Sequence, residues 1–282
     1  MAENTVKKIA TRESYGNSLK ELAEEFPNLV VLDADLAAAT KTGIFRKAYP
    51  DRHIDCGIAE SNMMGVAAGL SLVGKIPFVS SFAMFAAGRA FEQVRNSIGY
   101  PHLNVKIGAT HAGITVGEDG ATHQCNEDIA LMRTIPGMVV MCPSDDVEAR
   151  AAVRAALEYE GPVYIRFGRA AVPVINDHPG YHFEIGKGTI VREGKDVTIV
   201  ATGICVDSAL GAAKMLEEEG ISAEVVNICT IKPLDEEIII NSAKKTGKVV
   251  TVEEHSVIGG LGSAVCDCLS EKAPTKVLKI GV

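Results

Sequence analysis

The chain has 282 residues, of which 47% are apolar and only 5% aromatic, and its formal charge at pH 7 is −8. A common single domain has about 100–150 residues, so this length predicts one large domain or, as we prefer, two moderate ones. The acidic balance argues against the broad basic surface that nucleic-acid-binding proteins present. The seven cysteines are scattered, without the paired spacing of a disulfide framework or a zinc site, and we expect them to be reduced.

No segment approaches the roughly 18 consecutive apolar residues that a membrane-spanning helix requires. Residues 1–16, MAENTVKKIATRESYG, contain no apolar signal core. We therefore expect a cytoplasmic protein that has neither nucleic acid nor a membrane among its partners.

Short β-branched runs alternate with helical patterns along the chain, which is typical of parallel sheets with crossover helices. Buried strands are expected at 28–33, 52–56, 76–81, 103–109, 137–141 and 162–167. Helices are expected at 14–26, after Ala59, at 86–97 and from Ser144, which we expect to be an N-cap. The predicted fold class is α/β, with two domains of mainly parallel sheets and helices on both faces.

The alternation breaks at 168–188, where two prolines and four glycines follow no period, and we expect a linker there. The predicted domains are therefore 1–175 and 186–282. In the second domain we expect the following elements in chain order: strand 196–202, helix 205–219, strand 222–228, helix 235–247, strand 248–254, a helix from Leu261 and strand 276–282.

The most unusual segment, at 110–128, reads THAGITVGEDGATHQCNED and directly follows an expected strand. Loops at the carboxyl ends of parallel strands form the ligand crevice of open α/β sheets. In this loop, His111, Asp119 and His123 provide groups for proton transfer or hydroxyl recognition. The alternative is a long polar surface loop. We expect Cys125 to be a buried, neutral thiol.

Other polar and aromatic residues have ordinary structural interpretations when each is taken alone. Glu60 stands at the expected start of a helix, where the helix dipole favours a carboxylate. Phe82 and Phe85 fit a hydrophobic core. Solvated charges or structural hydrogen bonds are expected for the remaining candidates: Arg89, His53 and His255.

Taken together, and in this order, several segments resemble the transketolase family over almost the whole chain. They are CGIAESNMMGVAAGL, SSFAMFAAGRAFEQVRNSI, THAGITVGEDGATHQ, GPVYIRFGR, and finally VNICTIKPLD with VVTVEEHSVIGGLG. The resemblance implies a pyrimidine-binding domain at 1–175 and a transketolase C-terminal domain at 186–282. The chain would thus be the C-terminal half of a thiamine-diphosphate-dependent enzyme of carbohydrate metabolism, as in the pentose phosphate pathway.

The resemblance also implies roles on the cofactor side. In this family a glutamate hydrogen-bonds N1′ of the aminopyrimidine and favours the imino form that removes the thiazolium C2 proton, and Glu60 matches that glutamate. An apolar flank of Met63 and Met64 would favour a protonated carboxyl there by desolvation. Phe82 and Phe85 match the aromatic residues that pack on the pyrimidine.

On the substrate side, His111 and His123 match two loop histidines of the family, the first near the sugar phosphate and the second near the reacting hydroxyl and carbonyl. Asp119 matches an acid that hydrogen-bonds a hydroxyl of the donor sugar. Arg169 matches a phosphate anchor, for which a guanidinium is suited because its fork binds two oxygens at once.

Two positions and the length of the second domain depart from the family pattern. Gly88 stands where some members have a further aromatic residue, and Ala39 where many have a phosphate-contacting serine, which Thr40 is a candidate to replace. The second domain also looks short, because family members continue past the strand that matches 276–282.

The chain has no GDG motif, which in the family binds a divalent cation and through it the cofactor diphosphate. We therefore predict no metal ligands in this chain, and a separate N-terminal transketolase subunit that supplies Mg²⁺ or Ca²⁺ and shares the thiamine diphosphate. The chain alone would be inactive. We expect it to form a homodimer or, with that subunit, an α2β2 assembly. A truncated longer chain is the alternative.

Three other functions remain open. Deoxyxylulose-phosphate synthase shares the glutamate and the GxDGxTHQ loop, although that loop usually lacks a histidine at the position of His111. The β-subunit of a 2-oxo-acid dehydrogenase has a different loop. A non-catalytic relic that binds a partner through the same crevice is the third alternative. His111, IAESNM and IKPLD favour transketolase.

Overall fold

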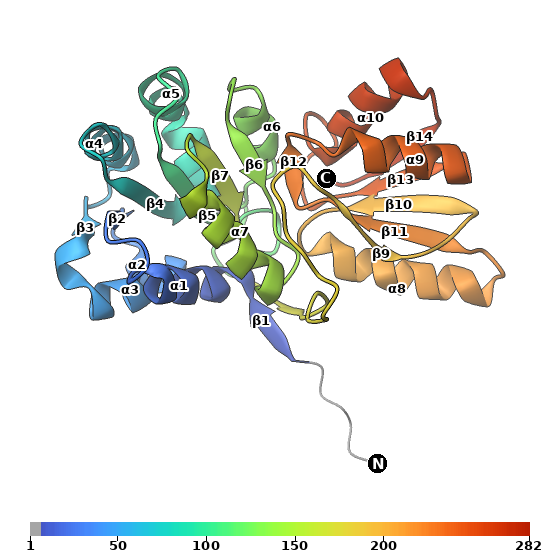
Figure 1. Ribbon diagram of the computed structural model, residues 1–282, viewed down its shortest axis with the longest axis horizontal. Helices are drawn as coiled ribbons and strands as arrows, with labels where there is room; N and C mark the ends of the chain where they lie inside the picture. Colours follow the sequence, from blue (N-terminus) through green and yellow to red (C-terminus); the bar gives the residue numbers. More distant parts are fainter. Residues whose placement is uncertain (1–6) are drawn as a thin grey trace, which may run out of the picture.

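The computed structural model describes residues 7–282, which form two lobes built on two separate sheets (Figure 1). The larger sheet has the strand order β12-β6-β7-β5-β4-β2-β3. Its strands are β2 (Leu29–Asp33), β3 (His53–Asp55), β4 (Ile76–Phe82), β5 (Lys106–Thr110), β6 (Val139–Met141), β7 (Val163–Arg166) and β12 (Thr230–Lys232). All neighbours pair in parallel except β12, which runs antiparallel to β6.

Helices cover both faces of this sheet, as continuous apolar strands require. On one face lie α1 (Thr11–Leu22), α3 (Gly43–Ala48) and α7 (Asp146–Glu158), whose side chains share one apolar core with the sheet. On the other lie α4 (Glu60–Leu72), the π-helical segments η2 (Met84–Arg89) and η3 (Val94–Gly99), α5 (Phe91–Gln93) and α6 (Asp128–Arg133). The short α2 (Ala37–Thr40) and η1 (Pro50–Arg52) connect β2 to β3.

The smaller sheet has the order β14-β13-β10-β11-β9. Its strands are β9 (Thr189–Arg192), β10 (Val197–Ala201), β11 (Ala223–Asn227), β13 (Val249–Val252) and β14 (Val277–Ile280). Only β9 is antiparallel to its neighbour. In Figure 1, α8 (Cys205–Glu218) covers one face, and α9 (Glu236–Thr246) and α10 (Leu261–Lys272) cover the other. Separately, β1 (Lys8–Ala10) pairs with β8 (Ala171–Pro173).

The predicted α/β fold with two mainly parallel sheets is confirmed, and the two lobes are tightly joined. Strand β12 comes from the second half of the chain but completes the sheet of the first. One apolar core accordingly runs from the α4 and α6 layer into the α9 and α10 layer. Residues 1–6 of the predicted first domain lie outside the described part of the chain.

Several expectations about single elements were wrong. The segment 52–56 is not buried, because β3 is an edge strand with mostly exposed side chains. Asp145, not Ser144, caps α7 by accepting a hydrogen bond from the backbone of Glu148, while the Ser144 hydroxyl donates to the Glu148 carboxylate.

Two helix limits also differ from those predicted. Helix α1 begins at Thr11 rather than at residue 14, because the chain leaves β1 in an extended conformation at Ala10 and turns directly into the helix. The expected helix 86–97 begins at Met84 and is mostly π-helical.

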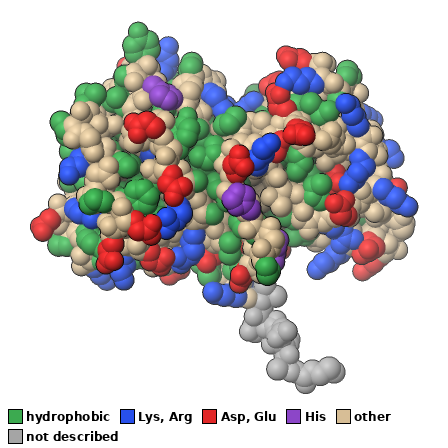
Figure 2. Space-filling model, viewed as in Figure 1, with side chains coloured by type: hydrophobic (Ala, Val, Ile, Leu, Met, Phe, Trp, Pro, Cys, Tyr) green, Lys and Arg blue, Asp and Glu red, His purple; other side chains and the backbone are tan. Residues whose placement is uncertain are grey.

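None of the helices within 7–282 is long and apolar enough to cross a membrane. Figure 2 shows acidic and basic side chains interspersed over one face of both lobes.

Candidate functional site

The candidate residues gather where neighbouring parallel strands of the larger sheet end. Phe82 is the last residue of β4, His111 follows the last residue of β5, and Glu60 begins α4 after β3. Since β3, β2, β4 and β5 are adjacent, their carboxyl ends lie along one edge of the sheet. The fold therefore brings together residues that are far apart in the sequence.

Aromatic rings form the centre of this cluster. The rings of Phe82 and His111 stack with centroids 3.9 Å apart, and those of Phe82 and Phe85 stack at 6.0 Å. The His123 ring meets Phe85 edge-on at 5.3 Å. The four rings form a continuous wall that a flat ligand ring can contact by offset stacking.

The Glu60 side chain is buried, with 2% of its surface exposed, at the N-terminus of α4 beside Met63 and Met64, which are also buried. Its carboxylate accepts a hydrogen bond from Arg89 Nη1 at 3.0 Å, and the Arg89 guanidinium lies 4.6 Å above the Phe85 ring. Arg89 is therefore not only a solvated helix charge. It links the carboxylate to the aromatic wall from the solvent side, where half of its surface is exposed.

His111 lies in a strongly cationic, buried environment. Burial lowers its pKa to about 3, and the charges of Arg12 and Arg169 contribute after it. Because Arg12 Nη1 donates to His111 Nε2 at 3.2 Å, the ring proton is on Nδ1, which donates to the Thr110 hydroxyl at 2.9 Å. His111 is thus neutral at physiological pH, with a fixed tautomer.

Sequence reasoning missed Arg12, which belongs to α1. Its Nη1 also donates to the Ala39 carbonyl, and its buried Nε has no hydrogen-bond partner within 7–282. Burial, and after it the charge of Arg169, lowers the pKa of Arg12. Both arginines line one cavity of about 460 Å³, together with Arg150 and the acidic residues Glu13 and Asp146. No local pattern distinguishes Arg12, and only the fold brings it to His111.

Arg169 and the tip of the 110–128 loop meet on the exposed side of the site. Arg169 Nη2 contacts the Glu118 carboxylate at 2.7 Å. Gly117 has a φ of +87°, and a Cβ there would lie 2.0 Å from Arg169 Nη1, so the loop passes directly over the guanidinium. Asp119 is exposed, and no hydrogen bond or ion pair within 7–282 connects it to the other candidate residues.

Thr40 is poorly placed to substitute for a phosphate-contacting serine. It is fully buried, and its hydroxyl donates to the carboxylate of Asp33 at 2.8 Å. Thr42 donates to the same carboxylate. The hydroxyl of Thr40 therefore organises the turn after β2 and is not directed at a ligand.

The remaining candidates are structural. His255 is fully buried and hydrogen-bonded, as expected. His53 differs from the expectation, because its buried Nε2 has no partner within 7–282, and burial lowers its pKa. Cys125 is buried, as expected, and burial raises its thiol pKa. Across residues 7–282, His, Cys, Asp and Glu side chains nowhere gather in threes as metal ligands do.

Comparison with known families agrees with this geometry. A model of the transketolase pyrimidine-binding domain matches residues 7–174, and a model of the transketolase C-terminal domain matches residues 186–282. The chain therefore belongs to the transketolase family and corresponds to its C-terminal half.

Individual relatives point the same way. The chain is 54% identical over 273 residues to a putative transketolase C-terminal section of Methanocaldococcus jannaschii, covering 96% of this chain and 85% of that protein. It is 49% identical over 271 residues to a 6-deoxy-6-sulfo-D-fructose transketolase subunit of a Clostridium species, covering 96% and 84%. Among solved structures it resembles a split gene transketolase described as an inactive β4 tetramer, with a TM-score of 0.91, 60% identity, and 98% and 90% of the two chains covered.

Proposed function

We propose that this chain is the C-terminal subunit of a split, cytoplasmic transketolase, which transfers a two-carbon ketol unit between sugar phosphates together with an N-terminal subunit. The observation that carries the proposal is the buried Glu60 carboxylate beside the stacked Phe82 and Phe85 rings, with two histidines against the same wall. This arrangement combines a hydrogen-bonding carboxyl with a flat apolar surface, which is what an aminopyrimidine ring requires.

The residues of the site fit thiamine diphosphate. Bound, the cofactor would supply a carbon nucleophile for breaking and making carbon–carbon bonds. Phe85 would carry the pyrimidine on the face that the Arg89 guanidinium now covers, and Arg89 is exposed enough to move aside. Glu60 would then hold the proton at the pyrimidine nitrogen N1′. Met63 and Met64, buried on the same helix, would keep water away from that carboxyl, and the ion pair with Arg89, which favours the ionised form, would open when Arg89 moves aside.

The cationic side of the site suits a sugar phosphate. Arg12 and Arg169 line one cavity next to His111, so an anion there would relieve their mutual repulsion. His111 Nε2 now accepts a hydrogen bond from Arg12. When Arg12 turns to the phosphate, this nitrogen would accept one from a substrate hydroxyl instead. His123, against Phe85, would move or hold a proton at the reacting hydroxyl, and Asp119 would bind a sugar hydroxyl.

The partner subunit would supply the rest of the cofactor site. We propose that it binds Mg²⁺ or Ca²⁺ and the diphosphate, so that this chain alone is inactive and the working form is an α2β2 assembly. Without that subunit, the chain would self-associate, at least to a homodimer. The description of the 60% identical relative as an inactive β4 tetramer supports this part of the proposal.

Reconstitution tests the proposal. The chain is mixed with the N-terminal transketolase chain of the same organism, thiamine diphosphate and Mg²⁺, and ketol transfer is measured with phosphorylated ketose donors and, separately, with the sulfonated ketose 6-deoxy-6-sulfofructose. We expect turnover only in the mixture, and no micromolar cofactor binding by this chain in calorimetry. Condensation of pyruvate with glyceraldehyde 3-phosphate, without ketol transfer, would instead identify a deoxyxylulose-phosphate-synthase-like enzyme. Micromolar cofactor binding by this chain alone would contradict the split site.

A further inference from the structure

A short segment of the smaller lobe, residues 254–256, contacts both ends of the loop that carries His123 and Asp119. It follows β13, and we call it the clasp segment. The loop in question is closed at its base by two backbone hydrogen bonds between Gly113 and Cys125. The clasp segment contacts the loop just after Gly113, at residues 114–115, and the chain just after Cys125, at Asn126.

Glu254 makes the contact at the first end. One oxygen of its carboxylate accepts hydrogen bonds from the backbone nitrogens of Ile114 at 2.8 Å and Thr115 at 2.7 Å. Gly113 has a φ of +78°, and a Cβ there would lie 2.2 Å from the carboxyl carbon of Glu254. The carboxylate therefore sits in a space that only glycine leaves open, and it fixes the direction in which the loop departs.

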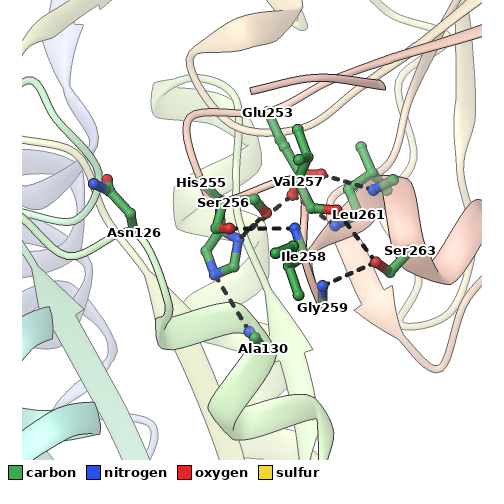
Figure 3. Close-up of polar contacts among 12 residues, drawn as sticks. Asn126, Ala130, Glu253, His255, Ser256, Val257, Ile258, Gly259, Leu261 and Ser263 are labelled. Atoms are coloured by element: carbon green, nitrogen blue, oxygen red, sulfur yellow. Dashed lines mark hydrogen bonds and ion pairs between the residues drawn. The ribbon is translucent and has the colours of Figure 1, made fainter. Parts of the chain in front are cut away.

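His255 and Ser256 make the contacts at the other end (Figure 3). The His255 Nδ1–H donates to the Ser256 carbonyl at 2.7 Å, so Nε2 is free to accept from the backbone nitrogen of Ala130 at 3.3 Å. The Ser256 nitrogen donates to the Asn126 carbonyl at 2.8 Å. The same three residues, 254–256, therefore contact the chain at the start of the loop and again after its end.

A buried ion pair anchors the clasp segment itself. Arg166, the last residue of β7, pairs with Asp128 at 2.9 Å, and its Nη2 donates to the Glu254 carbonyl at 2.7 Å. Both side chains are almost completely buried. The backbone of Glu254 is therefore fixed to the larger sheet, and its carboxylate has little freedom to follow the loop.

We propose that Glu254 is a positioning residue of the active site: it holds the 113–125 loop so that His123 stands against Phe85 and Asp119 is presented to the donor sugar. The catalytic consequence rests on the proposed transketolase function, whereas the effect on the loop does not. A residue of the C-terminal lobe thereby controls the geometry of site residues that this chain carries on its other lobe.

The neighbouring Glu253 is a matched control. Its carboxylate also accepts two backbone hydrogen bonds, from Leu261 and Gly262 at the start of α10, and it too is buried. Those contacts lie within the smaller lobe and do not touch the loop. Loss of either glutamate removes the same kind of interaction, but only Glu254 contacts the loop that carries His123, whereas Glu253 lies 3.8 Å from Nδ1 of His255.

Hydrogen exchange of the isolated chain, followed by mass spectrometry, tests the effect on the loop. In Glu254→Ala we expect the amides of Ile114 and Thr115 to exchange at least about tenfold faster than in the wild type, with the start of α10 unchanged. Glu253→Ala should show the reverse. If an alanine variant does not fold, the two Gln variants take its place with smaller shifts of about threefold. Unchanged exchange at 114 and 115 in a folded Glu254 variant would overturn the proposal.

Kinetics of the reconstituted complex test the consequence for the site. Glu254→Ala should raise the KM for the donor sugar phosphate and lower kcat, with the KM for thiamine diphosphate unchanged, and Glu254→Gln should recover most of both. A variant that only loses stability, as we expect for Glu253→Ala, contains less folded enzyme. Its apparent kcat falls in proportion, but its KM for the donor stays at the wild-type value. A wild-type donor KM in Glu254→Ala would reject the positioning role. A wild-type complex without ketol transfer would instead refute the proposed function, and the exchange experiment would still decide the role of Glu254 in the loop.

Discussion

The two sides of the candidate site are built differently. Glu60, Phe82 and His111 are buried and held by strand ends and a helix start, whereas Glu118 and Asp119 lie exposed at a loop tip. The side chains of the buried side are fixed by the fold of this chain, whereas at the loop tip one surface ion pair joins Glu118 to Arg169. The difference teaches that the fold itself positions the buried residues, whereas Glu118 and Asp119 at the loop tip have few contacts that hold them in place.

The largest effect is expected on the buried side. In the reconstituted complex, Glu60→Gln should lower turnover and slow exchange of the cofactor C2 proton by about 10²–10⁴-fold, because a general acid–base contact is lost. The fold should be retained, since the amide oxygen of glutamine can still accept from Arg89. The measurement is quench-flow with NMR detection of C2 exchange.

The exposed Glu92 in α5 provides the control for this variant. Glu92→Gln should exchange the cofactor proton at the wild-type rate. If Glu60→Gln does so as well, the catalytic glutamate is elsewhere.

On the exposed side, Arg169→Ala should raise the KM for phosphorylated donors by about 10–100-fold, as loss of a charge-assisted hydrogen bond implies, and leave unphosphorylated analogues almost unaffected. Arg154 is a suitable control, because it is an arginine of α7 paired with Glu25 away from the site. Steady-state kinetics with both donor types make the comparison, and equal losses for the two would reject phosphate binding by Arg169.

The sequence was sufficient for the buried side and insufficient for much of the rest. Glu60 and His111 each stand at the carboxyl end of an expected strand, and parallel strands end at one edge, so the pattern places both at that edge, whereas Phe82 was grouped with them only by the family resemblance. Arg12 and His111 are 99 residues apart, and Glu254 and Ile114 are 140 apart. No local pattern encodes such contacts, because they depend on how the crossovers and the two lobes pack. The catalytic and binding roles of the seven candidate residues stay predictions.

The edge of a sheet is similarly hard to predict from one sequence. The segment around His53 has the alternation of an ordinary strand, but whether a strand is central or at an edge depends on strand order. The π-helical geometry from Met84 to Gly99 also has no simple signal in the apolar pattern. It nevertheless decides where Phe85 and Arg89 point.

The neutral state of His111 predicts a pH dependence of stability. Its pKa falls from 6.5 to about 3 on folding, mainly through burial. Between these values the unfolded chain binds one more proton, so the stability contributed above pH 6.5 is lost progressively as pH falls towards 3. This corresponds to about tenfold in the unfolding equilibrium constant per pH unit. The free energy of unfolding, measured by urea at several pH values, should depend less steeply on pH in His111→Asn than in the wild type. An unchanged dependence on pH would contradict the assignment.

The smallest effect is expected for the ion pair at the loop tip. Glu118 is exposed and Arg169 is partly exposed, so solvent screens their attraction. In Glu118→Gln the guanidinium is no longer shared with a carboxylate, and affinity for a phosphorylated donor should rise, by at most about fivefold. Thermal unfolding should be unchanged. Glu158→Gln, which removes an exposed carboxylate beside Arg154, should leave the donor KM at the wild-type value. A weaker affinity in Glu118→Gln would mean that Glu118 helps to place Arg169 for the phosphate, and the exposed side would then be preorganised like the buried one.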